Sequence, residues 1–382
     1  MFYIILYLAK IANFFISILN LGAGYTWPGH IALALYPNIL SHKKLDFPLG
    51  VVLISGTNGK TTTSKLLTHI LESTDVKVTH NKTGANLLNG LVSATLLDMS
   101  LLGSHNSQIG VFEVDENNLP LILERINPNV LVLLNLSRDQ LDRYGEVDLI
   151  LEKWSSSVET LEASTEIVLD KTQPYFKKLI ENFKGEITYF DEEPSYLNKT
   201  SLIGKFTAKN VNAAVYTSML LGIDEVDIEN SLENFEYAYG RGEQVSYRDK
   251  DYRILLAKNP ASFENNLEVI NDSEVSADTL LFVFNDNIPD GRDVSWIYDI
   301  SPEALSGACK GKNIYVCGTR YMDMAVRLKY AGVDIKEENV FASLESTVAA
   351  ITANEESLSV LAFPNYSAML QLRKILTGKA IL

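Results

Sequence analysis

Short apolar runs alternate with amphipathic segments along residues 50–190. The run at residues 51–55, for example, precedes a segment in which Leu66, Leu67, Ile70 and Leu71 recur at helical spacing. The pattern predicts strands at 51–55, 76–80, 109–114, 129–134, 165–170 and 186–190, and helices at 61–73, 86–99, 117–126, 147–163 and 172–183. Strands that alternate with helices predict an α/β fold with a doubly wound, mostly parallel sheet, which binds ligands at the carboxyl ends of its strands.

A polar interruption at residues 191–205 separates this region from two further helical patterns at 207–222 and 225–234. A second α/β pattern follows, with strands at 245–257, 279–285, 313–317 and 358–363 and helices at 261–270, 321–331, 343–354 and 366–376. We therefore predict three parts: an N-terminal apolar helix and lead-in (1–45), a nucleotide-binding domain (46–238) and a smaller C-terminal α/β domain (239–382).

The first 20 residues are apolar and contain one charge, Lys10. They show neither the cationic start nor the cleavage site of a secretory signal. Their polar residues fall on one helical face, and apolar residues occupy the opposite face: Lys10, Asn13, Ser17 and Asn20 against Ile4, Leu8, Ile11, Phe15 and Leu19. This spacing favours a helix that packs on the protein or lies at a membrane surface over a helix that spans the membrane.

Composition restricts the classes of function. A hydrophobic fraction of 46% and a charged fraction of 21% are typical of a globular protein, and 382 residues suggest two or three domains. The net charge of −15 argues against broad binding to nucleic acids, which needs a basic surface. Two cysteines, Cys309 and Cys317, form neither a zinc-site spacing nor a disulfide framework, so a reducing cytosol is expected.

Residues 56–62, with the sequence GTNGKTT, connect the first strand to the first helix. Glycines in such a turn let backbone N–H groups approach phosphate oxygens, a lysine reaches the outer phosphates, and a threonine hydroxyl can bind Mg²⁺. Ile54 stands where the usual motif has its first glycine, and a chance glycine turn is the alternative. We predict that ATP is bound by Gly56, Thr57, Asn58, Gly59, Lys60, Thr61 and Thr62.

Two acidic or polar clusters follow strands of the same predicted sheet. Glu113, in the run 111–116, alternates with apolar neighbours and can face the cleft, where it would hold Mg²⁺ together with Thr61. A solvated acidic strand end is the alternative. Residues 135–146 (NLSRDQLDRYGE) come at the end of another strand, where substrates bind in open α/β sheets, although a loop with surface ion pairs would look the same.

Together these motifs resemble the Mur ligase superfamily, ATP-dependent enzymes that form amide bonds through an acyl phosphate. The closer similarity is to the MurT family, the ligase-like subunit of lipid II isoglutaminyl synthase. That similarity extends over nearly the whole chain, in the segments TWPG (26–29) followed by IALAL, NKTGAN (81–86), LAKNPA (256–261), NDNIPDGRDVSW (285–296) and PNY (364–366).

The resemblance implies a concrete reaction. Enzymes of this family amidate the α-carboxyl of the D-glutamate in the lipid II stem peptide, using ATP, Mg²⁺ and ammonia. The ammonia comes from a GatD-type class I glutamine amidotransferase, whose Cys-His pair is completed by an aspartate of the ligase subunit. That aspartate matches Asp293 here, which from sequence alone would be only a turn residue. Lys60 and Glu113 match the other catalytic positions, and the heterodimer would work in the cytoplasm, at or near the inner face of the membrane.

Two cations are assigned to the second domain or its junction. Arg241 could clamp an anion bidentately when the domains close, and Lys258 could contact substrate or phosphate. For both residues a surface ion pair is the alternative.

Three departures from the family pattern stand out. Most MurT proteins carry a four-cysteine zinc ribbon before the segment that here reads IGKFTAKNVNAA (203–214), and no cysteine occurs at 191–202, so no zinc is expected. In the adenine-side motif Asn210 is retained, whereas Thr207 replaces an asparagine. Gln140 stands where other Mur ligases have a metal-binding histidine, which agrees with MurT.

Two alternative functions stay open: an amino-acid-adding ligase of the folylpolyglutamate type, and an inactive ATP-binding scaffold for a glutaminase.

Overall fold

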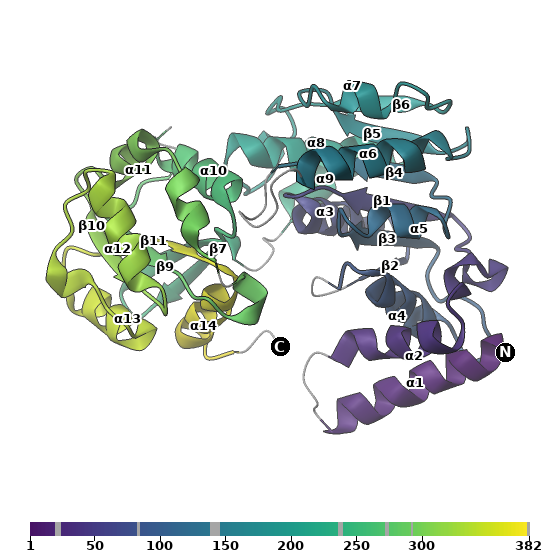
Figure 1. Cartoon of the computed structure of the whole chain (residues 1–382), viewed down its shortest axis with the longest axis horizontal. Helices are drawn as coiled ribbons and strands as arrows, with labels where there is room; N and C mark the ends of the chain where they lie inside the picture. Colours follow the sequence, from purple (N-terminus) through teal and green to yellow (C-terminus); the bar gives the residue numbers. More distant parts are fainter. Residues whose placement is uncertain are drawn as a thin grey trace.

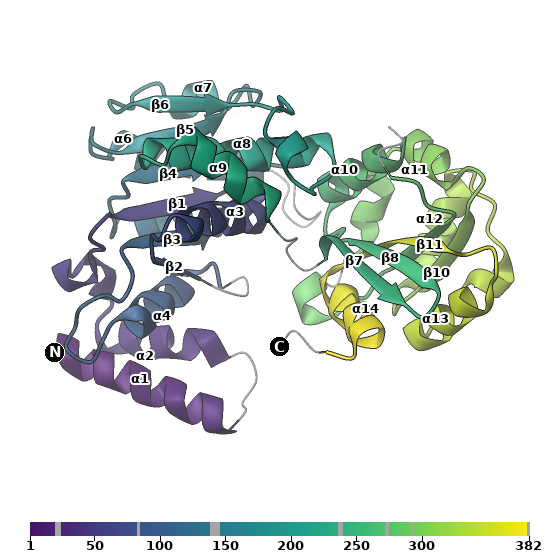
Figure 2. The same cartoon turned by 180° about the vertical axis from the view of Figure 1, so that it is seen from behind.

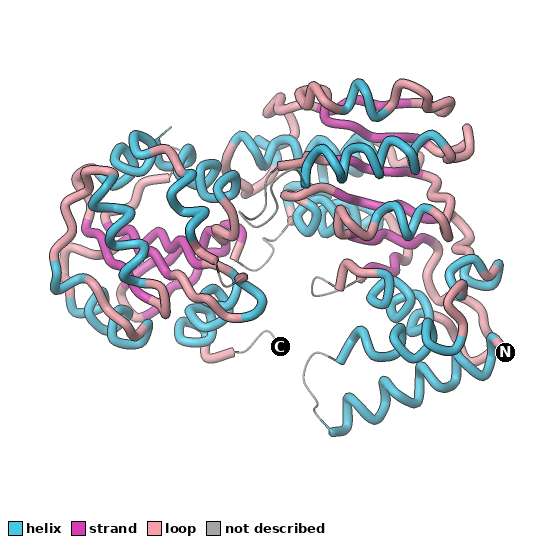
Figure 3. Tube along the Cα trace, in the orientation of Figure 1, coloured by secondary structure: helices cyan, strands magenta, loops and turns pink. Residues whose placement is uncertain are grey.

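Two β-sheets, one in each half of the chain, organise the fold of this computed structural model (Figure 1). The structure describes residues 1–19, 24–81, 85–137, 146–235, 240–271, 275–291 and 293–379. Figure 3 shows the two sheets side by side, each covered by helices, with the N-terminal helices beyond the lower edge of the larger sheet.

The first sheet has six parallel strands in the order β2-β3-β1-β4-β5-β6. Its strands are β1 (Val51–Ser55), β2 (Val78–His80), β3 (Ile109–Val114), β4 (Val130–Leu133), β5 (Glu166–Asp170) and β6 (Ile187–Phe190). The chain leaves β1 in one direction for β2 and β3, and then crosses to β4 on the other side. The carboxyl end of β1 is therefore a topological switch point, where open sheets of this kind bind ligands.

Helices cover both faces of this sheet because its strands bury alternate side chains on opposite sides. Val52 and Ile54 of β1 face α3 (Lys60–Ser73), α8 (Lys205–Leu220) and α9 (Glu225–Glu233). Val51 and Leu53 face the other layer, which includes α4 (Leu88–Asp98), α5 (Leu119–Leu123), α6 (Glu146–Glu159) and α7 (Phe176–Leu179). Figure 2 shows α3, α8 and α9 from their own side. The continuous apolar character of the strands follows from this double coverage.

The N-terminal segment forms α1 (Phe2–Leu19) and α2 (Trp27–Leu35), which pack with α4 beyond β2. The buried face of α1 consists of Phe2, Ile5, Leu6 and Ala9. The predicted helix is therefore present, but it packs through a different face from the predicted apolar row, of which Ile4, Leu8, Ile11 and Phe15 are exposed. Within the described ranges, no helix combines the length and apolarity that a membrane crossing needs.

The second sheet has the order β10-β9-β11-β8-β7 and is parallel except for the β7–β8 hairpin. Its strands are β7 (Arg241–Tyr247), β8 (Lys250–Leu255), β9 (Thr279–Val283), β10 (Asn313–Cys317) and β11 (Ser359–Pro364). One face packs on α10 (Pro260–Asn271), α11 (Pro302–Cys309) and α12 (Tyr321–Tyr330), and the other packs on α13 (Leu344–Ala353) and α14 (Tyr366–Thr377). Short 3₁₀ turns lie at Gly24–Thr26, Ile39–Ser41, Lys43–Leu45, Leu197–Lys199, Ile288–Asp290, Ser295–Asp299 and Glu337–Asn339.

The predicted fold class is confirmed: a doubly wound parallel sheet followed by a smaller α/β unit. One predicted element is wrong, because the single strand expected at 245–257 is a hairpin. Arg248 adopts a left-handed conformation (φ 55) and reverses the chain, and Ser246 Oγ donates to Asp251 Oδ1 across the turn at 2.7 Å. The sequence pattern also missed α11, which begins at Pro302 after the N-cap Ser301. The domain boundaries before residues 46 and 239 stay predictions.

Candidate active site

The phosphate loop between β1 and α3 depends on glycine at two positions. Gly59 has a φ of 91, and a Cβ there would lie 2.1 Å from Asn210 Oδ1, whereas Gly56 has a φ of 147. Gly59 is the N-cap residue of α3, so its left-handed conformation sets the direction in which the helix N-terminus faces the loop. Backbone N–H groups in the first turn of a helix have no partner within the helix and favour anions. This geometry is suited to binding phosphate.

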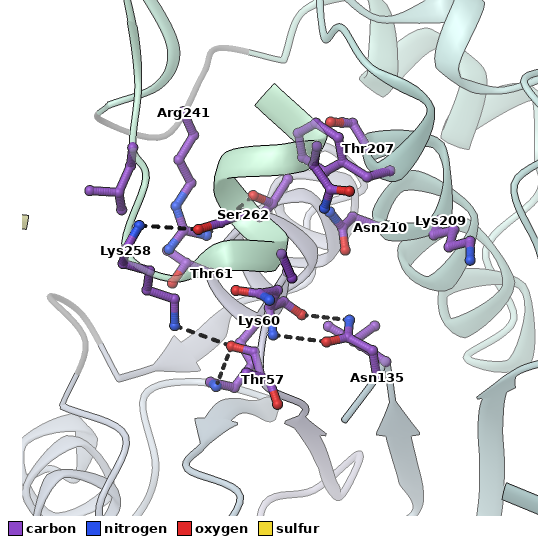
Figure 4. A pocket seen from close by; sticks show the side chains of 18 of the residues that line it. Thr57, Lys60, Thr61, Asn135, Thr207, Lys209, Asn210, Arg241, Lys258 and Ser262 are labelled. Carbon is purple, nitrogen blue, oxygen red and sulfur yellow. Dashed lines mark hydrogen bonds between the residues drawn. The ribbon is translucent and has the colours of Figure 1, made fainter. Parts of the chain in front are cut away.

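A neighbouring segment after β4 holds the loop in shape. The Asn135 side chain accepts from Asn58 N and donates to Asn58 O, both at 3.0 Å. Thr57 N donates to Asn135 O at 2.9 Å, and Ser137 N donates to the Thr57 hydroxyl at 3.0 Å (Figure 4). The loop is therefore fixed by the strand end beside it, which reduces the entropy that phosphate binding must overcome.

Lys60 is buried at the start of α3 and points back into the loop. Its Nζ donates to the carbonyl oxygens of Gly56 and Thr57, and it forms an ion pair with Glu116 Oε2 at 3.0 Å. The Glu116 carbonyl in turn accepts from Trp154 Nε1 at 2.8 Å. The ammonium is thus paired with a carboxylate oxygen of Glu116, which follows β3, and this interaction resembles the one it would make with a phosphate.

Glu113, at the end of β3, faces the first turn of α3. Its two carboxylate oxygens accept from Thr61 Oγ1 and Ser64 Oγ, both at 2.9 Å. The Asn81 side chain fixes its backbone with two hydrogen bonds of 2.8 Å. A hydroxyl and a carboxylate are the hard oxygens that Mg²⁺ prefers, and waters and phosphate oxygens usually complete its shell. The residues present therefore fit a magnesium ion bound together with a nucleotide.

The second half of the chain reaches the phosphate loop directly. Lys258 Nζ donates to Thr57 O at 3.2 Å, and Asn259 Nδ2 donates to Asn58 Oδ1 at 3.2 Å (Figure 4). Arg241 Nη1 donates to Thr62 Oγ1 at 3.3 Å. Residues from both sheets therefore meet at the same loop.

Lys65 and Arg241 add positive charge close to this loop. Burial lowers the pKa of Lys65, the Arg241 charge lowers it further, and Glu113 opposes the shift. Burial likewise lowers the pKa of Arg241. Two half-buried cations that repel each other favour an anionic ligand between them, because the ligand relieves the repulsion. The site thus holds a local pair of cations in a chain whose net charge is −15.

A cavity of about 1380 Å³ connects these groups, and residues from both sheets line it. This volume exceeds the usual range for one small ligand, so it can hold a nucleotide and a second substrate. Asn210 lines the cavity next to Gly59, and Leu202, Ile203, Phe206 and Thr207 also line it. Lys209 is held at the side by Asp170 at 3.3 Å and by Thr172 at 2.7 Å (Figure 4).

Asp293 lies apart from the other predicted site residues. It is exposed, it is not among the residues that line the cavity, and its Oδ1 accepts from Ser295 N at 2.8 Å. Pro289 and Asp290, earlier in the same loop, do line the cavity. The structure therefore brings Lys60, Thr61, Glu113, Asn210 and Arg241 together, and it places Asp293 at the surface a short way along the chain.

Some predicted residues lie outside the described ones: Gln140 with the rest of 138–145, part of the NKTGAN segment at 82–84, Tyr239 and Arg292. Sequence reasoning assigned no role to Lys65, Asn81, Glu116 or Asn135. Lys65 follows Thr61 by one helical turn, so its spacing was a usable signal. The partners of the other three come from distant parts of the chain, which a local pattern does not reveal.

Comparison with known proteins agrees with this architecture. The family model described as Mur ligase middle domain matches residues 54–196, and the model described as MurT ligase C-terminal matches residues 256–369. The chain is 29% identical to a Staphylococcus aureus (strain COL) protein named lipid II isoglutaminyl synthase (glutamine-hydrolyzing) subunit MurT, over 91% of each chain. It is 26% identical to the protein of that name from Streptococcus pneumoniae, over 95% of this chain and 94% of the relative.

Solved structures with the same fold include two MurF proteins. Acinetobacter baumannii MurF matches with a TM-score of 0.71 and 17% identity, over 91% of this chain and 80% of that chain. Thermotoga maritima MurF in complex with ADP matches with a TM-score of 0.65 and 16% identity, over 90% and 83%. At these identities the likeness concerns the fold alone. Two consecutive domain matches and full-length relatives that share both domains show that the chain belongs to the Mur ligase superfamily and, within it, to the MurT family.

Proposed function

We propose that this protein is the ATP-dependent ligase subunit that amidates the D-glutamate α-carboxyl of lipid II, giving D-isoglutamine in the peptidoglycan precursor. One observation carries the proposal: a phosphate loop with Lys60, Thr61 and Glu113 opens into a cavity that Arg241 and Lys258 reach from the second half of the chain. The names of the full-length relatives support the choice of substrate. In this arrangement residues 46–238 bind ATP and residues 239–382 close over it.

The reaction requires two anions to meet. A carboxylate oxygen attacks the γ-phosphorus of ATP, and ADP leaves. Ammonia then attacks the acyl carbon, phosphate leaves, and the nitrogen loses a proton to give the amide. Lys60, the N-terminus of α3, Arg241 and Lys258 offset the repulsion between carboxylate and phosphate. Thr61 and Glu113 would hold magnesium, which supplies further neutralisation of the phosphates.

We further propose that ammonia comes from a GatD-type glutaminase and that Asp293 completes the Cys-His pair of that partner. The exposure of Asp293 supports this role, because a group that acts across an interface must be accessible before assembly. The hydrogen bond from Ser295 N fixes the direction of its carboxylate. The lipid-linked substrate places the complex at the cytoplasmic face of the membrane.

Reconstitution tests the main proposal. The chain, its glutaminase partner, glutamine, ATP and lipid II should yield amidated lipid II, measured by mass spectrometry. Lys60→Ala should lower the rate by about 10³-fold, because it removes a cation from the transferred phosphoryl group. If the complex hydrolyses glutamine but never amidates lipid II with ATP present, the protein is a scaffold and the proposal is wrong.

A second experiment separates the two chemistries. Asp293→Asn should abolish glutaminase turnover in the complex, because the neutral amide cannot stabilise a partner imidazolium. ATP affinity, measured by calorimetry, should be unchanged, since Asp293 does not line the cavity. Amidation should return when free ammonia replaces glutamine. Normal glutaminase turnover in this variant would rule out the role of Asp293.

A further inference from the structure

An apolar surface runs along the outer side of α1. Its members recur at helical spacing, so they form one row on the helix: Ile4, Leu8, Ile11, Phe15 and Ile18. Ile11 and Phe15, for example, are 51% and 55% exposed. We call this row the α1 stripe. Monomeric soluble proteins rarely expose a continuous row of large apolar side chains, so the stripe indicates a binding surface.

The loop that follows α4 extends this surface. Leu101 and Leu102 are exposed beside α1, where Tyr7 Oη donates to Leu101 O at 3.2 Å and Tyr3 Oη donates to Leu102 O at 3.4 Å. Figure 1 shows α1 along the outer edge of the molecule, with α2 and α4 between it and the larger sheet. The helix therefore lies flat on the protein, and its stripe faces outward along its length.

Charge near the start of α1 is mainly positive. Lys43 and Lys44 are exposed there, and one acidic residue, Asp46, is exposed beside them in the sequence. Lys10 lies on another side of the helix, where its Nζ donates to Leu97 O at 3.2 Å. Lys44 is exposed, and its Nζ donates to Tyr3 Oη at 2.6 Å. Asp98, at the end of α4, is bonded to His105 and Ser107, and its side chain is only 8% exposed. The surface thus combines apolar groups with lysines in an otherwise acidic protein.

We propose that the α1 stripe lies in the interfacial layer of an anionic phospholipid membrane. Apolar side chains would enter the boundary between headgroups and acyl chains, and Lys43 and Lys44 would contact lipid phosphates. The exposed rings of Tyr7 and Phe15 suit this depth, since aromatic residues gather at membrane interfaces. The inference deepens the proposed function, because it identifies the surface that meets the membrane that carries the substrate.

A second copy of the chain fits the surface less well. A two-fold contact places the same patch on both subunits. Lys43 and Lys44 of the two copies would then face one another, with one acidic residue, Asp46, in each N-terminal segment to offset them. An anionic lipid surface supplies the missing charge.

Vesicle cosedimentation of the full-length chain tests the inference. The protein should sediment with vesicles of phosphatidylglycerol and phosphatidylcholine, and more weakly with phosphatidylcholine alone. Ile11→Asp combined with Phe15→Asp should lower the partition coefficient at least about tenfold, since both side chains are exposed and the change puts charge into the interface. Met322→Asp combined with Val326→Asp is the matched control: these residues are exposed at the same spacing on α12 and should leave vesicle binding unchanged.

Wild-type protein that does not sediment, or a stripe variant that sediments like wild type, overturns the proposal. The same holds if the stripe variant changes a dimer to a monomer in light scattering, or releases the glutaminase partner, without changing vesicle binding.

Activity measurements distinguish a failure of this inference from a failure of the proposed function. The stripe variant should lose amidation of lipid II in vesicles and keep amidation of a water-soluble lipid II analogue with a short prenyl chain. Loss of both activities would contradict the membrane role of α1, and a wild-type complex inactive on both substrates would contradict the proposed function instead.

Discussion

At Gly59 a single backbone position determines the shape of the phosphate loop. A left-handed φ of 91 and a contact with Asn210 Oδ1 leave no room for a side chain. The sequence motif predicted this glycine and Lys60 correctly as parts of one loop between β1 and α3. It did not predict that Glu116 pairs with Lys60, because that contact joins residues 56 positions apart. The local sequence pattern is therefore enough to predict the loop, whereas the contact of Lys60 with Glu116 depends on the tertiary fold.

Replacing Gly59 with alanine should therefore weaken nucleotide binding. The substitution adds backbone strain of about 1–2 kcal/mol and forces the Asn210 side chain away from the loop. Calorimetric titration with ATP and magnesium should show at least about a tenfold loss of affinity.

Gly222→Ala is the matched control, since Gly222 has a similar φ of 84 but no atom lies within 4 Å of the place that a Cβ would occupy. It should lower stability by the same strain and leave ATP affinity as it is. Equal loss of affinity in both variants would show that strain alone, and not the Asn210 contact, decides binding.

At the scale of elements, the sequence predicted nearly every strand because buried parallel strands are short, apolar and bounded by polar turns. The failures have local causes. The β7–β8 hairpin reverses at Arg248, a residue type that seldom adopts positive φ, so the run at 245–257 looked continuous. The helix α11 is too short for a clear apolar period, although Ser301 followed by Pro302 is a start signal.

The end of α4 offers a pH-dependent test. Burial raises the pKa of Asp98, but hydrogen bonds from His105, Ser107 and Thr79 outweigh it and lower the pKa to about 2. Because the folded-state pKa is below the unfolded one, this carboxylate stabilises the fold above about pH 4 and loses that effect as the pH falls towards 2. Asp98→Asn should cost about 2 kcal/mol at pH 7.

Urea unfolding between pH 7 and pH 3 should show this cost as constant down to about pH 5 and shrinking below pH 4. Asp334→Asn, at an exposed site, should change the free energy of unfolding by less than about 0.5 kcal/mol at every pH. A cost for Asp98→Asn that grows as the pH falls would contradict the assignment.

At the scale of the whole molecule, the site forms because residues from both halves of the chain contact the same phosphate loop. Lys258 and Asn259 contact Thr57 and Asn58, which lie about two hundred residues earlier in the chain. Sequence analysis assigned Lys258 and Arg241 to the substrate side from their place at or beyond the predicted domain junction, and no local pattern showed their contacts. The size of the cavity and the crowding of Lys65 and Arg241 were not predictable, because they depend on how the two halves pack.

This contact predicts that ATP couples the two halves. ATP with magnesium at about 100 times its dissociation constant should stabilise the protein by about 2.7 kcal/mol. Hydrogen exchange should then slow in the phosphate loop and also at residues 258–262. In Lys258→Ala the loop should still be protected, while residues 258–262 should lose at least half of the effect. Lys177→Ala, an exposed lysine on α7, should behave like wild type. Full protection of both segments in Lys258→Ala would show that the halves respond independently.

The ion pair between Lys60 and Glu116 has a consequence for the resting enzyme. Glu116 supplies the counter-charge for the buried Lys60 ammonium, so this cation is not left unpaired when no nucleotide is bound. A nucleotide phosphate must replace Glu116 as the partner of Lys60. The measured affinity for the nucleotide therefore reflects the difference between these two interactions. Inorganic anions face the same competition, which favours ligands that also contact Thr61 and Glu113, the proposed magnesium ligands, and the rest of the cavity.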